Sequence, residues 1–228
     1  TGLGFQPDFV WIKSRNQADF SHMLYDVVRT AVSGPFDIRS NSGNAQSTDS
    51  SGLVSFDSDG FTLNNGGYVN TGTFVSWNWK AGGSPSSNTD GSITSSVSAN
   101  TTNGFSIVKY TGNGSAGATI GHNNSLSTGN INANGNDFVA YCFAEKKGFS
   151  KFGSYVGNGN ADGTFIYTGF KPAYFVIKRT DATENWYCTD IKRNPINPVD
   201  NELLLLNSDS TTITTSYPVD FLSNGFKI

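Results

Sequence analysis

The chain has 228 residues, of which 36% are hydrophobic, 13% aromatic and 14% charged, and its formal net charge is −3. This length is ample for a hydrophobic core that needs no metal or disulfide to hold it together. The 15 Lys and Arg residues are scattered singly or in pairs, so they form no basic stripe of the kind that binds nucleic acid. We therefore expect no nucleic-acid partner.

No run of the chain approaches the roughly 18 apolar residues that a membrane-spanning helix needs. No basic-then-apolar leader is present, and the sequence does not begin with Met. These features predict a soluble piece, processed or excised, without membrane insertion.

The composition predicts an all-β protein. Gly occurs 26 times and Met once, aromatic residues are frequent, and Asn, Ser and Thr are abundant. Aromatic and β-branched residues suit strands, whereas Gly and Asn suit tight turns. No sustained helical period is found, so we expect helix in less than about 10% of the chain. In chain order, the expected strands lie at 8–13, 21–28, 52–63, 73–80, 104–112, 137–145, 150–157, 163–169, 173–179, 201–207 and 219–228.

Two kinds of strand can be distinguished by their side-chain pattern. The runs at 9–13 and 174–178 are apolar on both faces, which predicts central strands covered on both sides. The run at 74–80 alternates, with Val75, Trp77 and Trp79 on one face and more polar residues between them. That alternation predicts a strand with one buried face.

One phrase occurs twice. "GFQPDFVWIK" begins at Gly4 and "GFKPAYFVIK" begins at Gly169, 165 positions later. "VSFDSDGFTL" from Val54 and "VDFLSNGFKI" from Val219 are separated by the same interval. Two anchors that keep one spacing indicate a repeated segment, which we call segment A, and predict that residues 4–63 and 169–228 superpose with Ile12 and Ile177 both buried.

Two shorter segments recur in the same way. "FVSWNWKAGG" from Phe74 resembles "FVAYCFAEKKG" from Phe138 (segment B), and "YTGNGSAG" from Tyr110 resembles "YVGNGNADG" from Tyr155 (segment C). The order A, B, C, linker, B, C, A predicts a single duplicated β-sandwich domain over residues 1–228. The alternative is two small tandem sandwiches over 1–121 and 122–228.

The second copy of segment A ends at residue 228, where segment B follows the first copy. The last strand is therefore expected to lack a neighbour, which is an aggregation hazard. We expect it to pair beside a B strand from elsewhere in the chain or to be covered by another subunit.

The only stretch long enough to be a linker is the low-complexity run at 81–104. We interpret it as a surface loop within a domain, with "SITSSV" as a short strand inside it, rather than as a domain boundary.

Cys142 and Cys188 form no CxxC or Cys/His cluster, so no zinc site is predicted. Both lie in strand-like aromatic runs, which favours two small buried side chains, with a single bridge between them as the alternative. His22 and His122 have no second His or carboxylate at ligand spacing. No metal site is predicted.

Catalytic carboxylates are scarce. Glu145, Glu184 and Glu202 are isolated, so the carboxylate pair of a glycosidase has little to be built from, although Asp57/Asp59 and Asp8/Asp26 could converge in space. The recurring [DN]-x-[DN]-Gly runs at 57–60, 88–91 and 160–163 are interpreted as turns, and calcium is the alternative. We expect no catalytic residues and no cofactor.

A carbohydrate-binding face needs exposed aromatic rings beside amides and carboxylates. The aromatic candidates are Trp77, Trp79, Trp186, Tyr110 and Tyr155, and the alternative for all of them is the sandwich core. Because binding sites on a β scaffold tend to lie on loops, the ligand-binding candidates are Trp186, Asp57, Asp59, Asp90, Asn158 and Asp162.

The run "GFSKFGSYVGNGNADGTFIYTGFKPAYFVIKRTDATENWYCTD", together with "GFQPDFVWIKSRN" and "VSFDSDGFTL", resembles a repeat domain of uncharacterised function. That domain occurs in tail-fibre and other structural proteins of marine bacteriophages and uncultured viruses. The resemblance covers nearly the whole chain and weakens between about His122 and Asn136, where other members carry a longer segment A. It implies an antiparallel jelly-roll sandwich of the concanavalin or laminin-G type, and no catalytic residues.

The resemblance implies a non-enzymatic virion module that adheres to a host-surface glycan or protein. Its expected location is the virion, and its expected partners are other virion subunits, further copies of the chain and a host glycan. The alternatives are a structural or decoration protein without a ligand and, disfavoured by the shortage of Glu pairs, a glycan-degrading enzyme of the same sandwich class.

Overall fold

A computed structural model describes residues 2–31, 34–116, 118–120, 125–126, 131–194, 196–199, 202–213 and 218–228. In this part of the chain the fold is all-β apart from one short helix, α1 (Gly67–Asn70), and the paired strands run antiparallel. The strands are β1 (Phe9–Ser14), β2 (Met23–Asp26), β3 (Thr30–Ala31), β4 (Gly34–Arg39), β5 (Ser47–Thr48), β6 (Leu53–Asp57), β7 (Gly60–Leu63), β8 (Phe74–Trp79), β9 (Ser86–Asn88), β10 (Ser95–Asn100), β11 (Phe105–Thr111), β12 (Ala118–Thr119), β13 (Ser125–Leu126), β14 (Asp137–Phe143), β15 (Phe165–Tyr167), β16 (Tyr174–Lys178), β17 (Trp186–Asp190), β18 (Leu204–Leu205), β19 (Asp220–Leu222) and β20 (Gly225–Lys227). The predicted all-β class and low helix content are confirmed.

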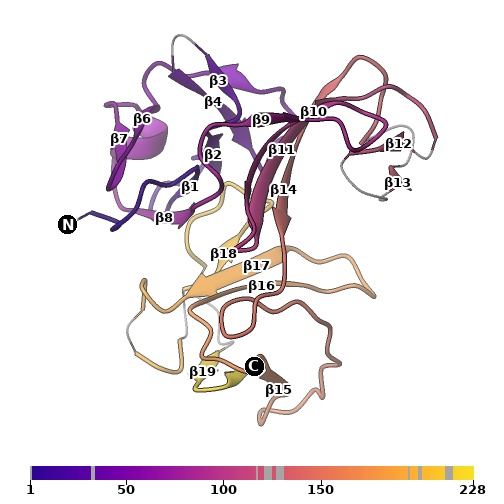
Figure 1. Ribbon diagram of the computed structural model, residues 1–228. Helices are drawn as coiled ribbons and strands as arrows, with labels where there is room; N and C mark the ends of the chain where they lie inside the picture. The colour runs from indigo at the N-terminus through magenta and orange to yellow at the C-terminus, as the bar shows by residue number, and fades with distance from the viewer. Residues whose placement is uncertain are drawn as a thin grey trace.

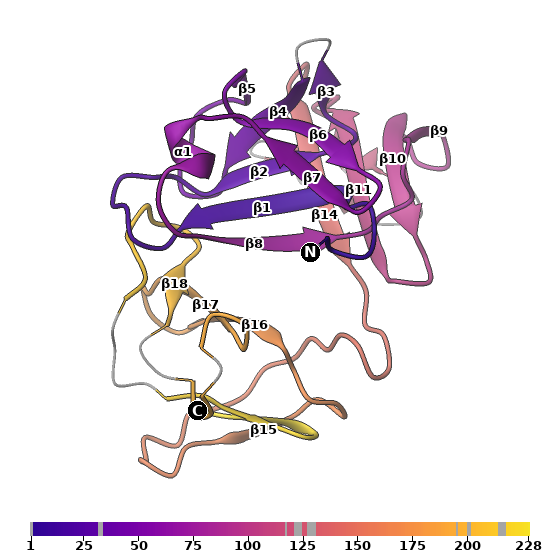
Figure 2. The same cartoon turned by 90° about the vertical axis from the view of Figure 1, so that its left-hand side faces the viewer.

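The N-terminal sheet has the order β3-β4-β2-β1-β8, with β5 paired to β4 (Figure 2). Strand β1 is an interior strand, paired with β2 and β8, and it is buried on both faces, as its doubly apolar sequence predicts. On one face, Val10, Ile12, Met23 and Tyr25 pack with side chains of the β6–β7 hairpin and α1. This face forms a core without help from the second half of the chain.

The opposite face of the N-terminal sheet is covered by two further sheets (Figure 1). The sheet β14-β11-β10-β9 packs over Phe9, whose ring stacks on that of Tyr141 with centroids 4.2 Å apart. The sheet β16-β17-β18 packs over Trp77, which joins Cys188 and Leu204 in a buried cluster. The result is sheet packed on sheet, as in a β-sandwich.

A third small sheet, β15-β20-β19, closes the C-terminal part of the chain. Phe175 of β16 stacks on Phe226 of β20 with ring centroids 5.0 Å apart, and Phe221 also contacts the Phe175 ring. The low-complexity run at 81–104 contributes β9 and β10 to a sheet, so it is part of the folded unit rather than a linker between domains.

The two copies of segment A share an unusual local geometry. Strand β1 pairs with β2, and Asp26 at the end of β2 bonds Arg29 at 2.7 Å. Strand β16 pairs with β17, and Asp190 at the end of β17 bonds Arg193 at 2.7 Å. In both places the other carboxylate oxygen accepts the backbone N–H groups two and three residues further on. We call each of these buried pairs an Asp–Arg clamp.

Each clamp is closed by an aromatic side chain of segment B from the other half of the chain. The Tyr141 hydroxyl of β14 donates to Asp26 Oδ2 at 2.7 Å. The Trp77 Nε1–H of β8 donates to Asp190 Oδ2 at 3.2 Å. Since "FVSWNWKAGG" aligns Trp77 with Tyr141, the two contacts correspond, and the halves of the chain hold each other.

The hairpins that end the two copies also agree in register. Phe56 faces Phe61 across β6–β7, and Phe221 faces Phe226 across β19–β20. Segment B agrees as well, because β8 and β14 are both strands. Segment C does not, because Tyr110 lies within β11 whereas Tyr155 lies outside any strand.

Three predictions about the second half are wrong. Strand β16 is the edge of its sheet, so Val176 is 40% exposed and Ile177 only partly buried. Cys142 is exposed, because β14 presents that side chain on its outer face, whereas Cys188 is buried, and both thiols are free. The last strand, β20, pairs with β15 and β19 rather than with a B strand.

His22 and Lys13 lie in the seam where residues 202–213 dock on the N-terminal sheet. The His22 Nδ1 accepts the Trp11 indole N–H at 2.8 Å, and its Nε2–H donates to the Leu205 carbonyl at 2.9 Å. Lys13 Nζ donates to the Asp209 carbonyl at 3.0 Å. Both side chains are buried, which lowers the pKa of His22 to about 3 and that of Lys13 to about 8.

We predict acid destabilisation at His22. Because its pKa is about 3 in the folded chain and about 6.5 when unfolded, the unfolded chain binds more protons between these values. The free energy of unfolding should therefore fall by about 1.4 kcal/mol for each pH unit lowered through that window. Urea unfolding of the native protein and of His22→Gln should give a weaker dependence in the variant; equal slopes would contradict the assignment.

A second prediction concerns the first clamp. The change Tyr141→Phe leaves Asp26 and Arg29 buried without the hydroxyl that bonds both, and should cost about 1–3 kcal/mol of unfolding free energy. Tyr167→Phe is the matched control, because that ring is 65% exposed, and should change the value by less than about 0.5 kcal/mol. Equal costs in the two variants would show that the clamp contributes nothing.

Candidate functional site

The exposed indole of Trp186 is the first candidate for a ligand contact. Its side chain is 47% exposed at the start of β17, so the alternative of a core residue does not hold. Two amides lie beside its backbone: the Trp186 N–H donates to Asn207 Oδ1 at 2.9 Å, and Asn207 Nδ2 donates to Asn185 Oδ1 at 3.0 Å. We call Trp186, Asn185 and Asn207 the Trp186 surface.

The Trp186 surface combines an aromatic face with hydrogen-bonding groups held in place. A flat apolar ring can stack on the apolar face of a sugar, while amides exchange hydrogen bonds with its hydroxyls. Glu184 adds a carboxylate nearby along the chain, and it accepts the Tyr187 hydroxyl at 2.9 Å. That bond lowers the pKa of Glu184, so the carboxylate stays ionised at neutral pH.

The other aromatic candidates divide between the core and the surface. Trp77 and Tyr110 are buried, at 7% and 6% exposed, and Trp79 packs in the core cluster of Phe9. Tyr155 is 39% exposed. Sequence periodicity could not separate these cases, because all five rings lie in strand-like runs and differ only in what packs against them.

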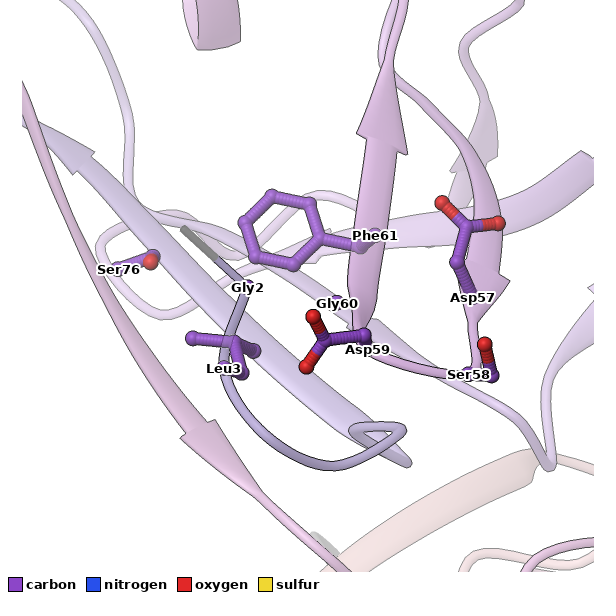
Figure 3. Close-up of a pocket in the computed structure, with 8 residues that line it drawn as sticks. All are labelled: Gly2, Leu3, Asp57, Ser58, Asp59, Gly60, Phe61 and Ser76. Atoms are coloured by element: carbon purple, nitrogen blue, oxygen red, sulfur yellow. The ribbon is translucent and has the colours of Figure 1, made fainter.

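Asp57 and Asp59 line one shallow hollow of about 460 Å³ at the turn of the β6–β7 hairpin (Figure 3). Figure 3 shows the Asp59 carboxylate beside Leu3 and below the ring of Phe61. Asp59 Oδ1 accepts the Gly4 N–H at 2.5 Å, and the Asp59 carbonyl accepts the Leu3 N–H at 2.9 Å. Asp59 therefore fastens the N-terminal segment to the hairpin.

The carboxylate of Asp57 is likewise engaged within the hairpin. Its two oxygens accept the hydroxyls of Ser55 at 2.7 Å and Thr62 at 2.6 Å. The Thr62 bond, followed by the Ser55 bond, lowers the pKa of Asp57. The run at 57–60 is a hairpin turn, as predicted.

Asp90, Asn158 and Asp162 lie in two separate loops. Asp90 accepts an amide N–H of Asn88 beside β9. Asn158 donates to the Asp162 carbonyl at 3.0 Å, and the Asp162 carboxylate pairs with Lys227. In Figure 1 the β9, β6–β7, β15 and β17 regions lie in different parts of the molecule, so the predicted residues do not form one site.

Sequence inspection missed the two Asp–Arg clamps, although a signal was present: Asp-x-x-Arg follows a strand at Asp26 and again at Asp190. Within the described residues, no group of three or more His, Cys, Asp or Glu side chains could hold a metal ion. His22 is buried between β1 and the 202–213 segment. His122 lies outside the described residues.

No helix in the described part of the chain is long and apolar enough to cross a membrane. The model of one protein family, described as Domain of unknown function (DUF7483), matches residues 1–131 and again residues 123–228. The two matches together span the chain and overlap at residues 123–131. No curated protein and no solved structure matches the chain.

Truncation should separate the exposed indole from the buried one. Trp186→Ala should change the free energy of unfolding by less than about 1 kcal/mol, because the ring contributes little to the core. Trp77→Ala removes a buried indole that bonds Asp190, and should cost about 3–5 kcal/mol. Urea unfolding measures both, and a large loss in Trp186→Ala would show that this ring supports the fold rather than a ligand.

Proposed function

We propose, on the premise that the chain belongs to the family Domain of unknown function (DUF7483), that it is a non-enzymatic structural module of a virus particle. In this role the module binds a host-surface glycan or protein through the Trp186 surface. The virion location and the tail-fibre type come from the resemblance of the repeated phrases to structural proteins of marine bacteriophages.

The observation that carries the adhesive role is the exposed Trp186 ring beside two hydrogen-bonded amides. A large indole left 47% exposed on a strand contributes less to the core than a buried one, and its exposed part can contact a ligand. Asn185 and Asn207 bond each other, so their positions relative to the ring are fixed before a ligand arrives. Calcium stays the alternative at the [DN]-x-[DN]-Gly runs at 57–60, 88–91 and 160–163.

A second candidate, a structural protein without a ligand, is favoured by a different observation. Nine of the fourteen exposed large apolar side chains among the described residues lie between 143 and 186. Exposed apolar surface of this kind is typical of protein contacts. In that role the partners are other virion subunits or further copies of the chain.

A glycan-degrading enzyme is disfavoured on the positions of its candidate carboxylates. Asp57 is engaged by two hydroxyls and Asp59 by a backbone N–H, and Asp26 is buried against Arg29. A hydrolase needs one carboxylic acid and one carboxylate facing the substrate. None of these three groups is placed for that task.

We also propose that the matched clamps and hairpin registers arose by duplication within a single jelly-roll domain. The single domain is favoured over the alternative of two tandem sandwiches because Trp77 and Tyr141 each close a clamp in the other half of the chain. Two independent tandem sandwiches over 1–121 and 122–228 would leave both clamps open.

A glycan array probed with and without calcium tests the adhesive role. The native protein should be retained on at least one class of surface glycan, and Trp186→Ala should lose that retention by more than about tenfold without a change in the thermal midpoint. Phe149→Ala is the matched control, because that ring is 64% exposed elsewhere on the surface, and it should bind like the native protein. Retention that survives Trp186→Ala would place the contact elsewhere, and no retention on any glycan would favour the ligand-free structural role.

A further inference from the structure

Two strands with open edges, β14 and β16, carry a further inference. Strand β14 ends the sheet β14-β11-β10-β9, and β16 ends the sheet β16-β17-β18. The first belongs to segment B and the second to segment A. In the first half of the chain the corresponding strands, β8 and β1, are paired with each other.

The β1–β8 pairing defines which backbone groups meet. Arg15 N–H donates to the Thr73 carbonyl at 2.8 Å, which marks the hydrogen-bonded phase of this antiparallel ladder. In the same phase, Lys13 faces Val75, Trp11 faces Trp77 and Phe9 faces Trp79. The backbone N–H and C=O groups of the odd-numbered residues of β8 therefore form their hydrogen bonds with β1.

On β14, the backbone groups that correspond to those β8 uses to bond β1 lie on the open edge of the strand. Ala144 N–H donates to the Gly104 carbonyl and Gly112 N–H to the Asn136 carbonyl, both at 2.8 Å, so the even-numbered residues of β14 bond β11. The backbone groups of Val139, Tyr141 and Phe143 point to the open edge. These residues align with Val75, Trp77 and Trp79 of β8.

Strand β16 presents the complementary phase. Ile191 N–H donates to the Ala173 carbonyl at 3.0 Å, so the odd-numbered residues of β16 bond β17. The backbone groups of Tyr174, Val176 and Lys178 point to the open edge. By the 165-residue interval these correspond to Phe9, Trp11 and Lys13 of β1.

We propose that β14 of one copy of this chain pairs antiparallel with β16 of a second copy, in the register of β1 with β8. Lys178 then faces Val139, Val176 faces Tyr141 and Tyr174 faces Phe143. Strand addition at a sheet edge supplies main-chain hydrogen bonds, and it covers the exposed side chains of Phe143 (43%) and Val176 (40%). This inference rests on the assembly role proposed above, because it identifies the partner in that assembly as a second copy of the chain.

The partner is a second copy because the two edges of one chain are not aligned. In Figure 1, β14 runs down the picture and β16 and β17 run across it. Each strand is also held on the N-terminal sheet, β14 by the Tyr141–Asp26 bond and β16 by the ring of Tyr174 on Trp77. Pairing within one chain would require one sheet to leave that position.

Each copy offers one edge of each kind, so the contact is heterologous. Such contacts generate closed rings where the rotation closes and filaments where it does not. Both outcomes suit a component of a particle built from repeated subunits.

Cysteine crosslinking tests the register directly. In this pairing Ala140 and Ile177 face each other at a non-hydrogen-bonded position, where Cα atoms lie about 4.5 Å apart, within the range of a disulfide. Two single variants, Ala140→Cys and Ile177→Cys, are prepared with Cys142→Ser to remove the exposed native thiol. When mixed and oxidised mildly, they should form a disulfide-linked heterodimer.

The matched control replaces Ile177→Cys by Val176→Cys, whose side chain points to the other face of the strand, and should give about tenfold less crosslinked dimer. Equal yields from both pairs would overturn the register. A single chain that carries both Ala140→Cys and Ile177→Cys and closes an internal disulfide at high dilution would overturn the choice of a second copy.

Light scattering of the native protein separates this inference from the assembly role. A mass that rises with concentration, without the Ala140–Ile177 crosslink, would keep the assembly role and overturn the edge pairing. A constant monomer mass together with no crosslink would overturn both. A rising mass with the crosslink supports both.

Discussion

A buried carboxylate bonded to an arginine three residues later is the interaction on which the arrangement of the sheets depends. The Asp26 and Arg29 side chains are 0% and 2% exposed, and those of Asp190 and Arg193 are 6% and 3% exposed. Breaking a buried pair by removing one partner costs about 3–5 kcal/mol, because an uncompensated charge remains. Such a pair specifies geometry, since the carboxylate has a fixed number of acceptor positions that the fold must fill.

Each Asp–Arg clamp fills its last acceptor position from the opposite half of the chain. Tyr141 completes the first clamp and Trp77 the second, and both come from the same position of segment B. The Arg29 guanidinium also donates to the Tyr141 hydroxyl, and the pKa of that hydroxyl is raised by burial and by Asp26. The two second-layer sheets therefore lie where the clamps hold them, which leaves the edges of β14 and β16 unpaired in the described chain.

The sequence predicted those features that depend on local pattern. The all-β class, the burial of β1 on both faces and the hairpin at 57–60 all follow from the side-chain pattern and the turn residues, whereas the alternation in β8 does not give one buried face, because Phe74 packs on the side opposite Trp77. The 165-residue interval also located the two hairpins whose Phe pairs share a register.

The features that sequence could not supply depend on contacts between distant segments. "YFVIK" has the composition of a central strand, yet β16 is an edge because no strand of the described chain lies beside it. Cys142 and Cys188 occupy similar aromatic runs, and only the layer that covers Cys188 makes them different. The candidate site shows the same limit: the sequence offered Trp186 both as a ligand contact and as a core residue, and its exposure and its two amides were visible only in the structure.

Amide hydrogen exchange resolved by residue tests most directly whether the clamps leave two complementary edges open. In dilute protein, the amides of Val139, Tyr141 and Val176 should exchange fast, whereas those of Ala140 and Ile177, which bond β11 and β17, should be protected. As the concentration rises, the first three should become protected together. Equal protection of all five amides in dilute monomer would contradict the account, because it would mean that both edges are already paired within one chain.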